Sequence, residues 1–111
     1  MKTIKTNELT GAALDWTTAK CEGRAWELVD SFIDYYEEGE MNYSTDWAHG
    51  GPIIERERLN IVPTSVGWEA YPDHGMSNEL FEVGLTPLIA AIRCYVASRL
   101  GDTVEVPEEL L

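Results

Sequence analysis

The segment from Thr86 to Gly101 constrains the fold more than any other part of the chain. It opens with Thr-Pro, which is typical of a helix N-cap followed by the first helical residue, and it ends at a glycine, a common helix stop. Between these ends, leucine, isoleucine, tyrosine and valine recur at helical spacing, and alanines with Cys94 widen the apolar arc. The pattern predicts a central core helix over about residues 87–100 that packs on more than one side.

Two earlier segments also have helical patterns. Residues 9–22 are bounded by Thr6 or Thr10 as N-cap and by Gly23 as the stop, which predicts a first helix. Residues 24–38 place apolar side chains on one side and acids on the other, which predicts a second, amphipathic helix. Its apolar side consists of Trp26, Val29, Phe32, Ile33 and Tyr36.

The residues from Ile53 to Ile61 alternate as in a strand, but neither side of such a strand is apolar. One interpretation is that the Glu-Arg-Glu-Arg run is a solvated rim and that only 59–62 forms a strand. The other is that Arg56 and Arg58 turn toward a ligand. The pattern leaves both interpretations open.

The remaining segments predict a short hairpin, an irregular loop and a tail. Pro63 and a turn over 64–67 separate the first strand from a second one over 67–71. Residues 72–84 are rich in turn formers and predict a loop without regular structure. The acidic tail over 102–111 is expected to be loose, although two of its valines are able to fold back.

These elements predict an α+β fold. Two or three helices pack on a small antiparallel β-sheet, with the helix over about 87–100 at the centre. The length of 111 residues and the hydrophobic content of 44% fit one domain spanning residues 1–111.

The chain is strongly acidic, with a formal charge of −12 from 20 acidic and 8 basic residues. This charge argues against direct binding of nucleic acid through its phosphates, and equally against anionic membrane surfaces. The acidic surface either provides solubility or attracts a basic partner by mimicking a polyanion.

The chain is expected in a reducing cytoplasm. Its longest apolar run, Leu88–Ile92, is far shorter than the ~20 residues of a membrane span, and its first residues lack the apolar segment of a signal peptide. Cys21 and Cys94 are far apart in sequence and lack a metal-binding pattern, so buried free thiols are expected.

The least ordinary chemistry lies in a predicted loop over residues 43–58. Short oxygen acceptors, a large aromatic ring, a histidine and a Gly-Gly-Pro turn stand close together there, which is typical of a binding pocket. The candidate ligand-binding residues are Ser44, Thr45, Asp46, Trp47, His49, Gly50, Gly51, Arg56 and Trp68. In the alternative interpretation Asp46 caps a turn, Trp47 anchors a core or interface, and Gly-Gly-Pro only reverses the chain.

Catalysis and metal binding have weaker support. Ser44, Asp46 and His49 are the residue types of a hydrolase triad, but three such residues within one short loop rarely adopt triad geometry. A metal site that adds Asp73 and His74 fits no established ligand spacing. Nucleotide-binding glycine motifs are absent from the sequence. We therefore expect no catalytic residues, no metal and no cofactor.

Three segments carry a family resemblance: Thr3–Gly23, Tyr43–Glu57 (YSTDWAHGGPIIERE) and Thr86–Asp102 (TPLIAAIRCYVASRLGD). Together they resemble the NinX-like family of small proteins encoded by lambdoid and related tailed phages and their prophages. The resemblance implies a phage accessory protein expressed in the bacterial host, and no catalytic residues come with it. Such proteins often act on host systems, so the resemblance makes counter-defence a reasonable hypothesis.

Three functions follow as hypotheses. The leading one is a non-enzymatic binding protein that holds a small-molecule ligand or a peptide of a host protein at Ser44–Arg58. The second is an acidic inhibitor that occupies the nucleic-acid-binding surface of a host nuclease or regulator. A small hydrolase comes third. Exposed aromatic side chains also make a homodimer possible.

Overall fold

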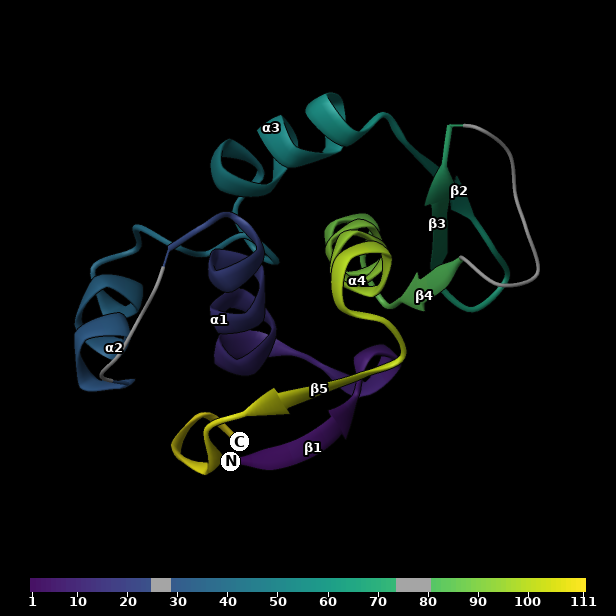
Figure 1. The fold of residues 1–111 in the computed structure, drawn as a ribbon. Helices are drawn as coiled ribbons and strands as arrows, with labels where there is room; N and C mark the ends of the chain where they lie inside the picture. Colours follow the sequence, from purple (N-terminus) through teal and green to yellow (C-terminus); the bar gives the residue numbers. More distant parts are fainter. Residues whose placement is uncertain (25–28, 74–80) are drawn as a thin grey trace.

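Helix α4 (Pro87–Leu100) lies at the centre of the fold, as the sequence predicts (Figure 1). The side chain of Thr86 accepts a hydrogen bond from the Ile89 amide at 3.1 Å, which caps the first turn. Residues all round the helix are buried, including Ile92, Tyr95 and Val96. An apolar arc this wide needs partners on several sides, and among the described elements α4 contacts both sheets as well as α1, α3 and η1.

The computed structural model describes residues 1–24, 29–73 and 81–111. In order, the elements besides α4 are β1 (Lys2–Lys5), η1 (Thr6–Glu8), α1 (Gly11–Cys21), α2 (Val29–Glu37), α3 (Trp47–Glu57), β2 (Leu59–Pro63), β3 (Trp68–Pro72), β4 (Glu82–Gly84), β5 (Thr103–Val106) and η2 (Glu108–Leu110). The predicted α+β class is confirmed. The described residues form four α-helices and two small antiparallel sheets.

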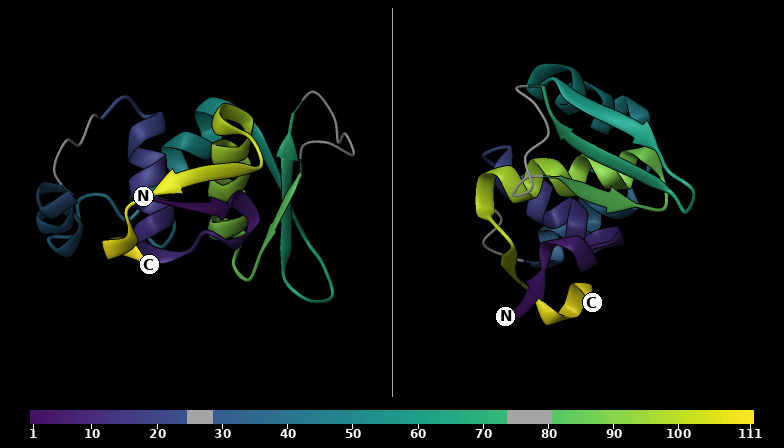
Figure 2. Two further views of the ribbon diagram at one scale, coloured as in Figure 1. Left: turned by 60° about the horizontal axis from the view of Figure 1, so that its bottom comes forward. Right: turned by 90° about the vertical axis from the view of Figure 1, so that its right-hand side faces the viewer.

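Strands β2, β3 and β4 form an antiparallel sheet in that order. The predicted hairpin is confirmed as β2–β3, whose register pairs Ile61 with Ala70. Ala70 is fully buried against Ala90, Ala91 and other small residues of α4, so one face of the sheet packs on that helix. The described helices all lie on this side of the sheet, and its other face is turned outward (Figure 2).

Strand β4 corrects the prediction of an irregular loop over 72–84. Gly84 pairs with Trp68, and the backbone of Gly84 packs tightly on α4, since an added Cβ would lie 2.6 Å from the Ala90 amide nitrogen. A glycine allows this close contact between strand and helix, although the sequence suggested a turn. Residues 74–80 of the predicted loop lie outside the described residues.

The two ends of the chain form the second sheet, β1 with β5. Val104 pairs with Ile4 and Val106 pairs with Lys2. Val106 has no exposed surface and Val104 is 6% exposed. The valines of the acidic tail thus fold back onto the core, as the sequence allows, and β1 supplies the backbone partners (Figure 2).

Helices α1 and α2 agree with the predicted helices in position. Helix α1 begins after Thr10, and Gly23 follows its end with a positive φ of 81°. Helix α2 places Phe32 in the core, while Trp26 of the predicted helix lies outside the described residues. Figure 1 shows α2 at the opposite end of the molecule from the three-stranded sheet.

Helix α3 replaces most of the predicted loop over 43–58, and the predicted strand from Ile53 is wrong up to Glu57. Asp46 caps the helix, and Ile53 is 2% exposed in the core. Burying an isoleucine in this way favours the helix over an exposed loop. The helix ends at Arg58, whose backbone is left-handed, and β2 then begins at Leu59, as one interpretation predicted.

No helix in the described ranges combines the length and the apolar surface that a membrane span needs. Cys21 and Cys94 are both free thiols, as predicted, with Cys94 buried and Cys21 half-buried.

Candidate functional site

The first half of the predicted site caps and anchors α3. The Asp46 carboxylate accepts a hydrogen bond from the Ala48 amide at 2.9 Å, which satisfies one of the free donors at the helix start. The side chains of Thr45 and Trp47 are exposed, and the indole of Trp47 keeps 54% of its surface. Asp46 thus has the capping role of the alternative interpretation, whereas Trp47 is not a core anchor.

Ser44 lies inside the protein against Asp15 of α1. The Ser44 amide donates a hydrogen bond to the Asp15 carboxylate at 2.8 Å, and neither residue has appreciable exposed surface. Burial raises the pKa of Asp15 to about 6, and the contacts with Ser44 counteract part of that rise. The pair joins α1 to the turn before α3, which is a structural role.

His49 also has a partner within the chain. Its Nδ1 atom accepts a hydrogen bond from the Asn42 amide at 3.2 Å, and its ring meets the Tyr43 ring edge-on at 6.4 Å between centroids. Asp46 and His49 therefore make separate contacts with different backbone amides. This arrangement gives no support to the hydrolase triad of Ser44, Asp46 and His49.

The two glycines of the predicted turn lie within α3 and differ in their surroundings. A Cβ on Gly50 would lie 2.3 Å from the Tyr43 carbonyl oxygen and 2.6 Å from a methyl group of Leu88. Gly50 therefore allows α3 to approach α4 and the preceding turn. Gly51 has open space around it and directly precedes Pro52, where a side chain in helical conformation would crowd the proline ring.

Arg56 binds carboxylates of its own chain. Its guanidinium donates to both carboxylate oxygens of Glu22, at 2.9 and 2.7 Å, and to Glu57 at 2.8 Å. These bonds lower the pKa of Glu22 and raise that of Arg56. Arg99 bonds Glu57 from α4, and the guanidiniums of Arg56 and Arg99 both lie over the Tyr95 ring. This cluster links α1, α3 and α4.

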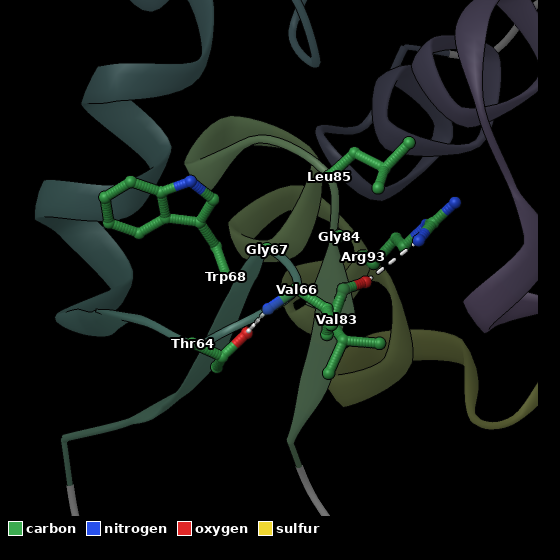
Figure 3. Close-up of a pocket in the computed structure, with 8 residues that line it drawn as sticks. All are labelled: Thr64, Val66, Gly67, Trp68, Val83, Gly84, Leu85 and Arg93. Atoms are coloured by element: carbon green, nitrogen blue, oxygen red, sulfur yellow. Dashed lines mark hydrogen bonds between the residues drawn. The ribbon is translucent and has the colours of Figure 1, made fainter.

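Trp68, the last residue of the predicted set, lies on β3, where it lines an apolar pocket of about 290 Å³ (Figure 3). The turn between β2 and β3, the end of β4 with the residue after it, and Arg93 in the middle of α4 line this pocket. Its lining residues are Thr64, Val66, Gly67, Trp68, Val83, Gly84, Leu85 and Arg93.

Close backbone contacts build the pocket. A Cβ on Gly67 would lie 2.6 Å from the Gly84 carbonyl oxygen, so the hairpin turn rests directly on the end of β4. Arg93 of α4 fixes the other side, because its Nη1 donates to the Val83 carbonyl at 2.9 Å and its Nε donates to the Leu9 carbonyl at 2.8 Å. These contacts hold the pocket walls on α4.

The rim of the pocket carries large apolar side chains in contact with solvent. Val66 is 85% exposed, Leu85 is 82% exposed and Val83 is 47% exposed. Sequence reasoning missed all three. Each adjoins a glycine or a predicted turn, but the pattern gave no sign that these segments meet in space.

Among the described residues, no group of histidine, cysteine, aspartate and glutamate side chains is arranged to hold a metal ion. The features that are open to a partner include the exposed apolar rim around the pocket and the exposed Trp47 at the start of α3.

Comparison with known proteins identifies the family. No curated protein matches the chain. The family model described as bacteriophage P22 NinX matches residues 5–99, which include α1, α3, both strands of the hairpin and almost all of α4. The chain therefore belongs to the bacteriophage P22 NinX family.

Proposed function

We propose that this phage accessory protein is a non-catalytic binding protein that acts on a host protein through the apolar pocket of Figure 3. The supporting observation is the exposure of Val66, Val83 and Leu85 around one pocket. Large apolar side chains gathered on a surface are typical of protein-binding sites, because water solvates them poorly.

The exposed rim of the pocket supports a protein partner over a buried small ligand. Sites for small ligands usually bury most of the ligand's surface. Here the apolar surface of the pocket, which measures about 290 Å³, continues outward onto the exposed rim. A side chain of the partner would fill the pocket while neighbouring residues cover the rim, as anchor residues do in protein interfaces.

The proposal keeps Trp68 from the predicted site and moves the main contact away from the start of α3. Ser44, Gly50 and Arg56 contact their own chain, as described above. Binding at Ser44–Arg58 stays a prediction, with Trp47 as its exposed member. A Trp47→Ala variant tests that prediction in the same experiment.

The proposal is tested by capture from the lysate of infected host cells. We expect a Val66→Ser/Leu85→Ser variant to lose the host proteins that the wild-type chain captures, measured by quantitative mass spectrometry. Both side chains are more than four-fifths exposed, so the variant is expected to keep its fold, which circular dichroism checks. The matched control is Leu100→Ser, an exposed leucine at the far end of α4. Unchanged capture by the rim variant would contradict the proposal.

An acidic inhibitor of a host nucleic-acid-binding protein is the second candidate. The sequence has no lysine or arginine between Arg24 and Arg56. Within that stretch, α2 and the turn after it expose Asp30, Asp34, Glu37, Glu38 and Glu40. Such a surface would meet the basic groove of a nuclease or regulator, and counter-defence is one setting for this role.

The second candidate predicts a different mutational signature. Replacing Glu37, Glu38 and Glu40 by glutamine should abolish capture. The Val66→Ser/Leu85→Ser variant should capture the same host proteins as the wild-type chain. The captured complex should also dissociate steeply between low and moderate salt. If capture survives the glutamine variant, α2 is not the contact surface.

A further inference from the structure

We propose that the partner presents to the pocket one large apolar side chain next to a lysine or arginine, and that this cation pairs with Glu69. The inference rests on the proposed function and names the chemistry of the partner. It follows from the position of Glu69, from the absence of an ion pair with its carboxylate among the described residues, and from the net charge of the chain.

Glu69 lies on the outward face of the sheet beside the pocket. Ala70, its neighbour on β3, is buried against α4, and successive side chains of a strand point to opposite faces. The register pairs Glu69 with Val83 on one side and with Val62 on the other. Directly paired residues lie about 4.5–5.5 Å apart at Cβ, so Glu69 is the strand neighbour of Val83, which lines the pocket.

Within residues 1–24, 29–73 and 81–111, Glu69 forms no ion pair, whereas the arginines nearest the sheet already have partners. Arg58 pairs with Asp73 at 2.9 Å. Arg93, the cation of the pocket, donates to the carbonyls of Leu9 and Val83. Glu69 is half-buried between two valines, so a cation brought by a partner would gain more there than at a fully solvated site.

The charge of the chain favours a basic partner over a second copy. Two copies that meet at this surface would bring two chains of −12 together and place Glu69 near its own equivalent. Pairing of a foreign strand with the sheet is also disfavoured. Arg93 occupies the Val83 carbonyl of β4, and Pro63 ends the opposite edge strand. Recognition therefore depends on side chains over the pocket.

Two synthetic peptides test the inference on the full chain. One carries a phenylalanine between lysines, and the other carries the same phenylalanine between glutamates. Binding is followed through the amide shifts of Val66, Glu69 and Leu85 in isotope-labelled protein. We expect only the lysine peptide to bind. We expect Glu69→Gln to weaken this binding about threefold or more, in line with one partly exposed ion pair.

The matched control is Glu37→Gln on α2, which removes the same charge at the opposite end of the molecule and should leave the affinity unchanged (Figure 1). Equal binding of both peptides, with loss in Leu85→Ser, would overturn the inference and leave the proposed function intact. Binding that ignores Leu85→Ser would count against the proposed function itself. Absence of shifts with either peptide would also overturn the inference.

Discussion

Asp15 is a carboxyl group with no exposed surface in a chain whose other acids mostly face water. The backbone amide of Ser44 is its hydrogen-bond donor, and burial raises its pKa to about 6, compared with 3.8 for a free side chain. Between these two values the folded protein holds a proton that the unfolded chain releases. Stability from this residue is therefore present at low pH and is lost as pH rises through about 6.

The first prediction concerns this pH dependence. From about pH 5 to about pH 8, loss of the proton from Asp15 should lower the free energy of unfolding by roughly 1–1.5 kcal/mol. Asp15→Asn keeps an oxygen acceptor for the Ser44 amide and cannot titrate, so its curve should lack this part of the fall. Urea unfolding of both proteins over the pH range measures the difference. If the free energies of unfolding of the two proteins changed with pH in parallel, Asp15 would have the same pKa in the folded and unfolded states.

The second prediction compares alanine substitutions at Gly50 and Gly51. Gly50→Ala should lower the free energy of unfolding by about 1–3 kcal/mol, because the new Cβ would overlap the Tyr43 carbonyl and Leu88. Gly51→Ala is the matched control. Its gain in helix propensity and its crowding against Pro52 oppose each other, so a change below about 1 kcal/mol is expected. Equal losses in the two variants would contradict the packing argument.

These glycines also show why part of the site escaped prediction. Gly-Gly-Pro usually marks a turn. Asp46 is typical of a residue that caps either a turn or a helix, so the sequence does not indicate that a helix follows it. The glycine at position 50 is explained by its close contact with Leu88, which lies 38 positions further along the chain. Contacts between residues so distant in sequence leave no local pattern, and the same holds for Val66 and Leu85 at the pocket rim.

At the scale of elements, the predictable parts were those with complete local signals. Helix α4 has its cap, its proline and its glycine stop, and the β2–β3 hairpin has a proline and a tight turn. Strands β1, β4 and β5 have at most 4 residues each, too few for a clear alternation. They form because a distant strand supplies the hydrogen bonds, as β1 does for β5.

The third prediction tests β5 as part of the core. Val106→Ala should cost about 2 kcal/mol of unfolding free energy, because the side chain is fully buried and its loss leaves a cavity. Thr103→Ala, in the same strand and exposed, should cost less than about 0.5 kcal/mol. Denaturant unfolding of the two variants provides the comparison. A Val106 variant as stable as the Thr103 variant would show that β5 contributes little to the core.

At the scale of the whole molecule, the charges are unevenly compensated. The ion pairs of the described residues join Glu22, Glu57 and Asp73 to arginines, and they gather near the ends of α1, α3 and α4 and the end of the β2–β3 hairpin. The acids of α2 have no lysine or arginine within the helix. The sheet that carries the apolar rim and helix α2, whose acids form no ion pair with the other described residues, therefore lie at opposite ends of the molecule (Figure 1).

The last prediction follows from this imbalance. At about 10 mM salt the Debye length is roughly 30 Å, similar to the molecular dimensions of 37 × 28 × 25 Å, so all the acids repel one another. At about 150 mM it falls to roughly 8 Å, and only near neighbours interact. Sodium chloride should therefore stabilise the protein by at least about 1 kcal/mol, or about 4 °C in the midpoint of thermal unfolding.

The same experiment separates two opposing effects of salt, the screening of repulsion between acids and the weakening of ion pairs. Salt also weakens the partly exposed ion pairs, but each contributes at most about 1 kcal/mol and loses only part of it. Replacing Glu37, Glu38 and Glu40 by glutamine removes three of the repelling charges. This variant should be more stable than the wild type at low salt and should gain less from added chloride. A midpoint that falls with salt in both proteins would show that the ion pairs outweigh the repulsion.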